Sequence, residues 1–336
     1  MDFTVNGIIV KGLSGSFQVR LSPEGASLLR ENGIEPDDGD TLYCRAKGAF
    51  RHEKLTLLVG DRVTLRVETE AAKSCGCRKD SRRTDEARAG IMVSSVDERK
   101  SELIRPPMAN LDMMFIVAAA ARPEPSLVLI DKLTTVADFK GIEPVVVVTK
   151  ADLAPERAAE ISAIYEKCGF KTFVEGVGRE SSGIDRFIFE NRNRISAFAG
   201  ASGVGKSTLM NRLFPSLNLS TGELSRKTER GRHTTRHVEL FGLDRQYEGA
   251  EGFIADTPGF GMLDFVQFDF YTKEDLPFVF REFEPYIGKC RYTKCSHTKE
   301  DGCAILEAVK NGEIPAERHR SYLEFYESLK NKKSWD

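Results

Sequence analysis

The chain has 336 residues, of which 40% are hydrophobic and 30% are charged, and its formal net charge is −2. This length allows two or three domains with separate cores, and the composition is that of an ordinary folded protein. The near-neutral charge excludes a global attraction to nucleic acid, so any such binding must come from local patches.

Membrane insertion and secretion are not expected either. The longest uninterrupted apolar run, residues 113–121, is far shorter than the ~20 residues of a membrane-spanning helix. The N-terminus lacks the basic and apolar regions of a secretory signal, and seven cysteines, an odd number, favour a reducing compartment over a disulfide framework. We therefore expect a cytoplasmic protein without membrane contacts.

Residues 1–98 are expected to form a small β domain. Segments of near-alternating polarity, separated by glycine or by Asp and Asn, predict strands at 7–11, 16–20, 41–45 and 61–67. This spacing is typical of an oligonucleotide-binding (OB) barrel, although a β module without nucleic-acid function also fits. Residues 71–90 interrupt the pattern as a polar insertion. Its pair Cys75 and Cys77 could join a metal or redox site, but a solvated loop is favoured because two ligands alone make no zinc site.

A charged, proline-containing connector at 99–110 predicts an interdomain linker. In residues 111–262, strands alternate with helices, which argues for a doubly wound α/β sheet covered on both faces. The predicted strands are 114–120, 144–149, 171–174, 194–199, 236–241 and 251–256, and the predicted helices are 126–139, 155–168, 183–191 and 207–214.

Residues 200–207 read GASGVGKS and fit the phosphate-binding loop G-x-x-x-x-G-K-[ST]. Glycines let backbone N–H groups turn toward phosphate oxygens, while Lys206 would reach the outer phosphates and Ser207 would ligate Mg²⁺. The loop lies between an apolar strand and a helical segment, so a helix N-terminus would point at the anion. An accidental glycine-rich turn is the alternative. The expected nucleotide-binding residues of this region are Gly200, Ala201, Ser202, Gly203, Val204, Gly205, Lys206, Ser207 and Thr208.

Two further motifs favour a GTPase. Residues 256–259 read DTPG and end an apolar strand, where Asp256 would act near Mg²⁺ and Gly259 would sense the γ-phosphate. Residues 149–152 read TKAD and resemble the guanine-recognition motif, in which Asp152 would accept from guanine N1–H and N2–H₂. Alone, TKAD could be a solvated strand end, but its combination with the other two motifs favours guanine binding. Its expected nucleotide-binding residues are Thr149, Lys150, Ala151 and Asp152.

The order of these motifs is unusual, because the guanine motif precedes the phosphate loop. Most GTPases that share the motifs have the opposite order. A circularly permuted sheet explains the reversal, since domain termini often lie close together. The segment expected to sense the γ-phosphate then leads directly into the C-terminal region.

Residues 263–336 are expected to form a helical domain with a metal site. Three thiolates and one imidazole lie within a short stretch and match a closed, tetrahedral Cys₃His zinc site; they are Cys290, Cys295, His297 and Cys303. No further candidate group suggests catalysis by this site, so its role should be structural. Helices are predicted at 304–311 and 315–332.

A β-barrel, a core with TKAD, GASGVGKS and DTPG in that order, and a Cys₃His module together resemble the ribosome small-subunit-dependent GTPase A family over nearly the whole chain. The resemblance implies an OB-fold, a circularly permuted P-loop GTPase domain and a helical zinc-binding domain. It implies GTP hydrolysis stimulated by the 30S subunit, 16S rRNA binding and a role in late 30S maturation. The implied cofactors are one structural Zn²⁺ and the Mg²⁺ that accompanies GTP, and a monomer is expected.

The resemblance also extends to the first switch, at 231–235, where Thr235 or, less favoured, Thr234 would ligate Mg²⁺. Arg236 departs from the family pattern. So does the stretch 174–182, where the family has a serine-alanine loop that contacts guanine; only Val177 and Gly178 can be placed near it.

Phe260 occupies the position at which Ras-like GTPases carry a water-orienting glutamine, so intrinsic hydrolysis should be slow. His233 looks like the family's catalytic histidine, and the expected catalytic residues are therefore His233 and Lys206. A structural role for His233, or a group supplied in trans by the partner, is the alternative. An ATPase or kinase, and a scaffold with a vestigial nucleotide pocket, are the competing functions.

Overall fold

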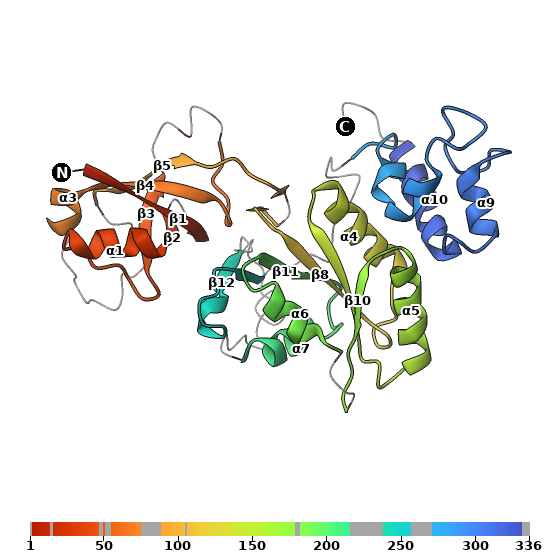
Figure 1. Ribbon diagram of the computed structural model, residues 1–336, viewed down its shortest axis with the longest axis horizontal. Coiled ribbons are helices and arrows are strands. Elements are labelled where there is room, and N and C mark those ends of the chain that lie inside the picture. Colours follow the sequence, from red (N-terminus) through yellow and green to blue (C-terminus); the bar gives the residue numbers. More distant parts are fainter. Residues whose placement is uncertain are drawn as a thin grey trace, which may run out of the picture.

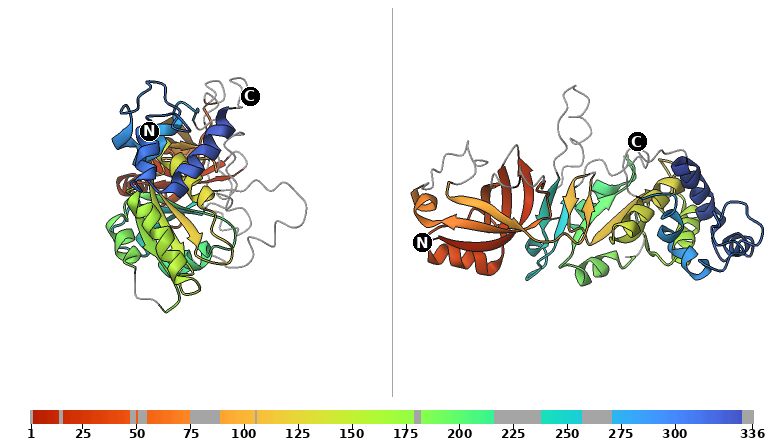
Figure 2. Two further views of the ribbon diagram at one scale, coloured as in Figure 1. Left: turned by 90° about the vertical axis from the view of Figure 1, so that its right-hand side faces the viewer. Right: turned by 90° about the horizontal axis from the view of Figure 1, so that it is seen from above.

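The three predicted regions follow one another along the longest axis of the computed structural model, as a β-barrel, an α/β sheet with helices, and a helical module (Figure 1, Figure 2). The structure describes residues 2–13, 16–46, 50, 55–74, 89–104, 106–178, 182–215, 238–256 and 271–330. None of the helices in these ranges is long and apolar enough to cross a membrane.

Near the N-terminus, strands close into a barrel with the order β1–β2–β3–β5–β4, and β4 pairs back onto β1. The strands are β1 (Asp2–Leu13), β2 (Ser16–Leu21), β3 (Thr41–Ala46), β4 (Arg62–Glu68) and β5 (Ile91–Val96). In β4, Val63, Leu65 and Val67 are buried while the residues between them are not. This alternation fills the barrel interior and leaves polar side chains outside. The predicted barrel is confirmed.

Two helices in this region are not expected from the sequence analysis. Helix α1 (Pro23–Glu31) connects β2 to β3, and Ser22 Oγ caps it by accepting from the Gly25 N–H at 3.0 Å. A serine followed by proline is a helix-start signal, which the sequence analysis did not use. Helix α3 (Thr69–Ser74) makes residues 71–74 helical rather than loop, because Ala72 is buried and alanine favours helix. Cys75 and Cys77 lie outside the described residues.

The connector between barrel and sheet is held against the barrel. It contains a two-stranded ladder of β6 (Glu102–Leu103) and β7 (Met108–Ala109). Arg99 donates from Nε and Nη2 to the fully buried carboxylate of Asp61 at 2.7 and 2.9 Å. Gly60 has φ +94°, and a Cβ there would lie 2.0 Å from the Ala109 carbonyl oxygen, so only glycine allows this approach. The described part of the linker is therefore ordered.

The central sheet has the order β10–β9–β8–β11–β13–β12, in which β12 is antiparallel to β13 and the other pairs are parallel. Its strands are β8 (Met113–Ala119), β9 (Glu143–Thr149), β10 (Lys171–Val174), β11 (Ile195–Ala199), β12 (Glu239–Gly242) and β13 (Phe253–Asp256). The phosphate loop follows the central strand β11, while TKAD follows β9. The predicted permuted α/β domain is confirmed.

Helices cover both faces of this sheet. They are α4 (Leu127–Phe139), α5 (Pro155–Lys167), α6 (Ile184–Glu190) and α7 (Lys206–Leu213). All residues of β8 are buried, and they divide between two cores. Met114 and Ile116 share a core with residues of α4 and α5, whereas Phe115 and Val117 share the other with residues of α6 and α7. This division is what a doubly wound sheet requires.

The C-terminal module contains the 3₁₀ helices η3 (Leu276–Val279) and η4 (Arg281–Tyr286) and the helices α9 (Ala304–Lys310) and α10 (Ala316–Lys330). Phe280, Phe283 and Tyr322 are fully buried and pack ring against ring at centroid distances of 5.0–5.4 Å. These rings therefore form an aromatic cluster that belongs to the same buried core as residues of α4 and α5, and both predicted helices are present.

The barrel and the central sheet meet edge to edge. Lys11 of β1 is paired with Glu239 of β12 in antiparallel register, and their side chains form an ion pair of 3.0 Å. Arg20 of β2 contacts Asp244, in the 3₁₀ helix η2 (Leu243–Arg245), at 2.9 Å. Strand β12 is the last strand of the central sheet on this side. The backbone N–H and C=O groups along its outer edge are therefore available to pair with β1.

Candidate nucleotide site and metal centre

The phosphate loop adopts a conformation that only glycine permits at several positions. Gly200, Gly203 and Gly205 have φ of +144°, +78° and +100°. A Cβ on Gly200 would lie 2.1 Å from the Val117 carbonyl oxygen of the neighbouring strand. The loop runs from the end of β11 into the first turn of α7, where Ser207 and Thr208 are exposed. The helix N-terminus therefore faces the side on which an anion would bind.

Lys206 lies partly buried inside this loop. Its Nζ donates to the carbonyl oxygens of Gly200 and Ala201, each at 2.7 Å. Burial lowers the pKa of Lys206, because desolvation disfavours the ammonium. A phosphate oxygen would offer the ammonium a full negative charge in place of two carbonyl dipoles, so an anion is the preferred partner of this side chain.

The TKAD segment contacts the phosphate loop directly, through residues that are more than 50 positions apart in sequence. Thr149 Oγ1 donates to the Val204 carbonyl oxygen and lies 3.2 Å from that of Ala118. Lys150, in the left-handed region at φ +55°, donates from Nζ to Gly203 O at 2.7 Å. Two motifs that are separate in the sequence therefore lie in direct contact in the fold.

Asp152 lies next to the loop that follows β10. Its exposed carboxylate accepts a hydrogen bond at Oδ1 from the backbone N–H of Val177, at 3.0 Å. The Ala151 N–H donates to Glu175 O at 3.1 Å, which fixes the same loop against TKAD. The Val177 side chain is 85% exposed. Residues 174–178, where no guanine-contacting motif is evident in the sequence, thus border the expected base site.

Two further residues link this loop to the phosphate-loop helix, and the sequence analysis missed them. Glu175 Oε2 forms an ion pair of 2.8 Å with Arg212 Nη2 on α7, and the Glu175 side chain is only 15% exposed. Arg212 Nη1 also contacts Asp185 Oδ2 at 3.2 Å. No local pattern predicts an ion pair between such distant residues.

The remaining predicted nucleotide residues lie at or beyond the edge of the described residues. Asp256 ends β13, whose Ala255 pairs in parallel register with Ala197 of β11. The backbone of Asp256 therefore lies at the carboxyl end of β13, next to the end of β11 where the phosphate loop starts. His233, Thr235 and Gly259 lie outside the described residues.

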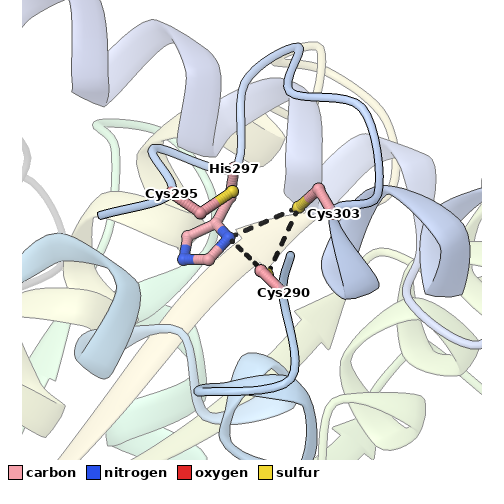
Figure 3. A group of neighbouring side chains, drawn as sticks. All are labelled: Cys290, Cys295, His297 and Cys303. Carbon is pink, nitrogen blue, oxygen red and sulfur yellow. Dashed lines mark hydrogen bonds between the residues drawn. The ribbon is translucent and has the colours of Figure 1, made fainter. Parts of the chain in front are cut away.

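The predicted metal ligands converge in the C-terminal module (Figure 3). The ligand atoms of Cys290, Cys295, His297 and Cys303 all lie within 4.8 Å of one another. His297 Nδ1 lies 3.5 Å from Cys290 Sγ and 3.4 Å from Cys303 Sγ, and these two sulfurs are 3.8 Å apart. A tetrahedron with metal–sulfur bonds of about 2.3 Å has edges of about 3.8 Å between its sulfurs, so the spacing suits an ion of this size.

The surroundings of His297 also suit a metal ligand. Burial lowers its pKa, which favours the neutral imidazole that a metal requires. Its backbone carbonyl oxygen lies 2.9 Å from His319 Nε2 on α10. The cluster can therefore hold one metal ion.

Fold and motifs define a circularly permuted P-loop GTPase with an N-terminal barrel and a C-terminal module that can bind a metal. Residues 96–266 match the RsgA GTPase family, and residues 6–72 match the RsgA N-terminal domain. The chain therefore belongs to the RsgA GTPase family and is a GTP hydrolase.

Individual relatives match over nearly their full length. The small ribosomal subunit biogenesis GTPase RsgA of Alkaliphilus metalliredigens is 36% identical, over 98% of this chain and 99% of that protein. That of Geobacillus kaustophilus is also 36% identical, over 97% and 98%. Among solved structures, YjeQ from Thermotoga maritima aligns with a TM-score of 0.73 at 27% identity, over 98% of this chain and all of that one. YloQ, a circularly permuted GTPase, aligns with a TM-score of 0.69 at 28% identity, over 98% and 96%.

Proposed function

We propose that this GTPase acts in the late biogenesis of the small ribosomal subunit, that it binds 16S rRNA, and that the 30S subunit stimulates its GTP hydrolysis. The main support is that relatives covering nearly the whole chain are named small ribosomal subunit biogenesis GTPases. The barrel and the metal module lie at opposite ends of the GTPase core (Figure 2). Two separated surfaces suit contact with one large partner at two points. Action in the cytoplasm as a monomer belongs to the same proposal.

The proposed domains are the barrel at 1–98, the linker at 99–110, the GTPase domain at 111–262 and the zinc-binding domain at 263–336. In the GTPase domain, TKAD binds the guanine through Asp152, and the phosphate loop surrounds the phosphates. Lys206 exchanges its two carbonyl partners for phosphate oxygens. Both carbonyl oxygens are bound by the same ammonium at the end of a flexible side chain, so one movement of that side chain releases both. Asp256 and Gly259 complete the site beside the γ-phosphate.

Ser207 and Thr235 would hold Mg²⁺, which neutralises charge on the phosphates when bound. The exposed position of Ser207 in the first turn of α7 supports its share of this role. Because Phe260 cannot orient a water molecule, His233 takes that task in the proposal. A 30S group acting in trans is the alternative, and such groups contribute roughly 10³–10⁵-fold in other GTPases.

Zinc is the proposed ion of the C-terminal cluster. Three thiolates and an imidazole in a closed arrangement form a structural zinc donor set, because no ligand position is left for a substrate. Elemental analysis of the protein purified under reducing conditions should find about one zinc per chain. A protein without bound metal would contradict this assignment.

The decisive experiment for the function is GTP turnover with and without purified 30S subunits, with ATP as the competing nucleotide. Strong stimulation of GTP turnover, with no ATP turnover, is expected. Equal turnover with and without subunits would contradict the proposal, and ATP turnover would favour the competing ATPase.

The basic segment 225–237 is the proposed coupling element between nucleotide and ribosome. It carries five cationic residues against one acid, Glu229, and includes the proposed switch; the cations are Arg226, Lys227, Arg230, Arg232 and Arg236. GTP would order its threonine end while rRNA phosphates hold its cations, so each ligand favours binding of the other. A solvated loop that only offsets triphosphate charge is the alternative.

Substitution of Arg226, Lys227 and Arg230 by alanine tests this coupling. The 30S affinity should fall and its dependence on salt should flatten, because fewer phosphate contacts release fewer counterions. GTP affinity of the free protein should change little. If stimulated turnover and its salt dependence both survive the triple substitution, the segment is not the coupling element.

A further inference from the structure

The loop that carries the metal ligands is organised around a carboxylate outside the ligand set, that of Glu300. Glu300 Oε1 accepts hydrogen bonds from the Ser296 N–H at 2.8 Å and from the Ser296 hydroxyl. Glu300 Oε2 accepts from the Thr298 and Lys299 N–H groups at 3.0 and 3.1 Å. Three backbone amides and one hydroxyl therefore converge on a single side chain.

These donors belong to residues next to the metal ligands Cys295 and His297, whose backbone determines where the two ligand side chains point. Ser296 lies between Cys295 and His297, and Thr298 directly follows His297. His297 itself has φ +58°, a conformation that residues other than glycine rarely adopt. The turn that brings His297 Nδ1 toward the sulfurs is therefore unfavourable for the backbone of His297 alone and must be stabilised by other residues. The bonds to Glu300 supply that support on both sides of His297.

Helix α10 holds the same residues from the other side. The Tyr322 hydroxyl donates to Ser296 O at 2.7 Å, and His319 Nε2 lies 2.9 Å from His297 O. Both side chains are buried. The Ser296 N–H is therefore bound to Glu300, while the Ser296 carbonyl oxygen is bound to Tyr322 of α10. All of these contacts join protein groups, and none of them requires a metal ion.

The charge of Glu300 is maintained at any pH at which thiolates bind metal. Burial would raise its pKa, but hydrogen bonds from Ser296 and from the backbone of Lys299 outweigh this effect and hold the pKa at about 2. The carboxylate is then an acceptor at all of its oxygens, as the convergent donors require.

We propose that Glu300 is a positioning residue of the metal centre, which holds residues 295–300 in the metal-binding conformation before the ion arrives. This inference rests on the proposed metal site. Because the ordering of the loop does not then have to be driven by the ion, the metal binds more tightly than it would to a loop without this carboxylate. Partners that orient ligands in this way typically contribute 10–100-fold to metal affinity.

The test compares Glu300→Gln with a matched control, Glu324→Gln. Glu324 is exposed on α10 of the same module, so the control removes the same charge without touching the loop. Reduced, metal-free full-length proteins are titrated with Co²⁺, whose thiolate and ligand-field absorption reports a tetrahedral sulfur-rich site. Glu300→Gln should bind Co²⁺ about 10–100-fold more weakly than the unsubstituted protein, and Glu324→Gln should bind it equally.

A second measurement needs no variant. In the metal-free unsubstituted protein, hydrogen exchange of the Ser296, Thr298 and Lys299 amides should be slowed, because Glu300 already binds them. Rapid exchange of all three would overturn the proposal, even if Glu300→Gln failed to fold. Equal Co²⁺ affinity of Glu300→Gln and the control would also overturn it, while leaving the metal site intact. A failure of the unsubstituted protein to bind Co²⁺ would overturn both.

Discussion

At the scale of single residues, the proposed guanine-binding residue Asp152 is held by a hydrogen bond to one of its carboxylate oxygens. An ionised carboxylate has about four lone-pair sites, and the Val177 N–H occupies only one of them. The others can accept from guanine N1–H and N2–H₂, groups that adenine lacks. A site of this kind can discriminate by roughly 10⁴-fold, because the wrong base leaves polar groups unpaired.

Asp152→Asn should therefore lose guanine selectivity. An amide accepts at one atom only, and its N–H₂ group would face the donors of guanine. Since a hydrogen bond to a charged group contributes about 1.5–3 kcal/mol, GTP affinity should fall at least about 10-fold. Binding of GTP and xanthosine triphosphate, measured side by side, checks this. Unchanged GTP affinity would remove Asp152 from the base site.

Val177→Pro removes the N–H that orients Asp152, while Val177→Ala retains it. Gly176 precedes the new proline and tolerates the backbone restriction that proline imposes on its neighbour. We expect GTP affinity to fall about 10-fold in the proline variant only, because one hydrogen bond to a charged group is lost. Isothermal titration with GTP is the measurement. Equal affinities of the two variants would show that the bond does not position Asp152.

The residue scale also shows what the sequence can and cannot reveal. The phosphate-loop glycines, TKAD and the Cys₃His cluster are short patterns whose chemistry depends on residue type and local spacing, so they can be proposed from the sequence. The contact of Val177 with Asp152 and the ion pair of Glu175 with Arg212 depend on how β10 and α7 pack in the sheet. Such pairings carry no local signal.

At the scale of elements, α10 joins the metal loop to the GTPase core. The fully buried Arg318 donates to Asp131 Oδ1 on α4 at 2.7 Å and to Glu282 Oε1 at 2.6 Å. Its guanidinium also lies 4.7 Å from the centre of the Phe280 ring. The helix was predicted correctly from its apolar spacing, but a buried arginine cannot be read from that spacing, because arginine is mostly exposed.

Replacing Arg318 by methionine should destabilise the C-terminal module by about 3–5 kcal/mol, since it leaves two buried carboxylates without their partner. Arg320→Met is the matched control, because Arg320 is exposed on the same helix and should cost within about 0.5 kcal/mol. Urea unfolding followed by circular dichroism measures both. A midpoint for Arg318→Met equal to that of the control would mean that the buried ion pairs contribute no net stability.

At the scale of the whole molecule, the reversed motif order predicted the permuted sheet, but not how the sheet meets the barrel. Strand β12 is the last strand of the central sheet on the barrel side, and it follows directly on the basic segment 225–237. The barrel strand β1 pairs with that edge, and the ion pair of Arg20 with Asp244 lies beside it. The barrel is therefore attached to the core at the first element after the proposed switch.

A fixed orientation of the barrel should matter most when a single large partner contacts both ends of the molecule. Loosening the junction would add an ordering cost to binding without changing any contact with the partner. Arg20→Glu creates such a loosened junction, because two carboxylates then face each other. A partly exposed ion pair contributes up to about 1 kcal/mol, so a weakening of 30S binding by about 5-fold is expected.

The charge-reversed double variant Arg20→Glu, Asp244→Arg separates junction geometry from barrel charge. It carries the same barrel substitution as Arg20→Glu but restores an ion pair between the two elements. Co-sedimentation with 30S subunits at fixed salt should show weakened binding by the single variant and recovery by the double variant, with GTP affinity of the free proteins unchanged. If the double variant binds as weakly as the single one, Arg20 acts through its own charge on the partner, and the orientation of the barrel is not what limits binding.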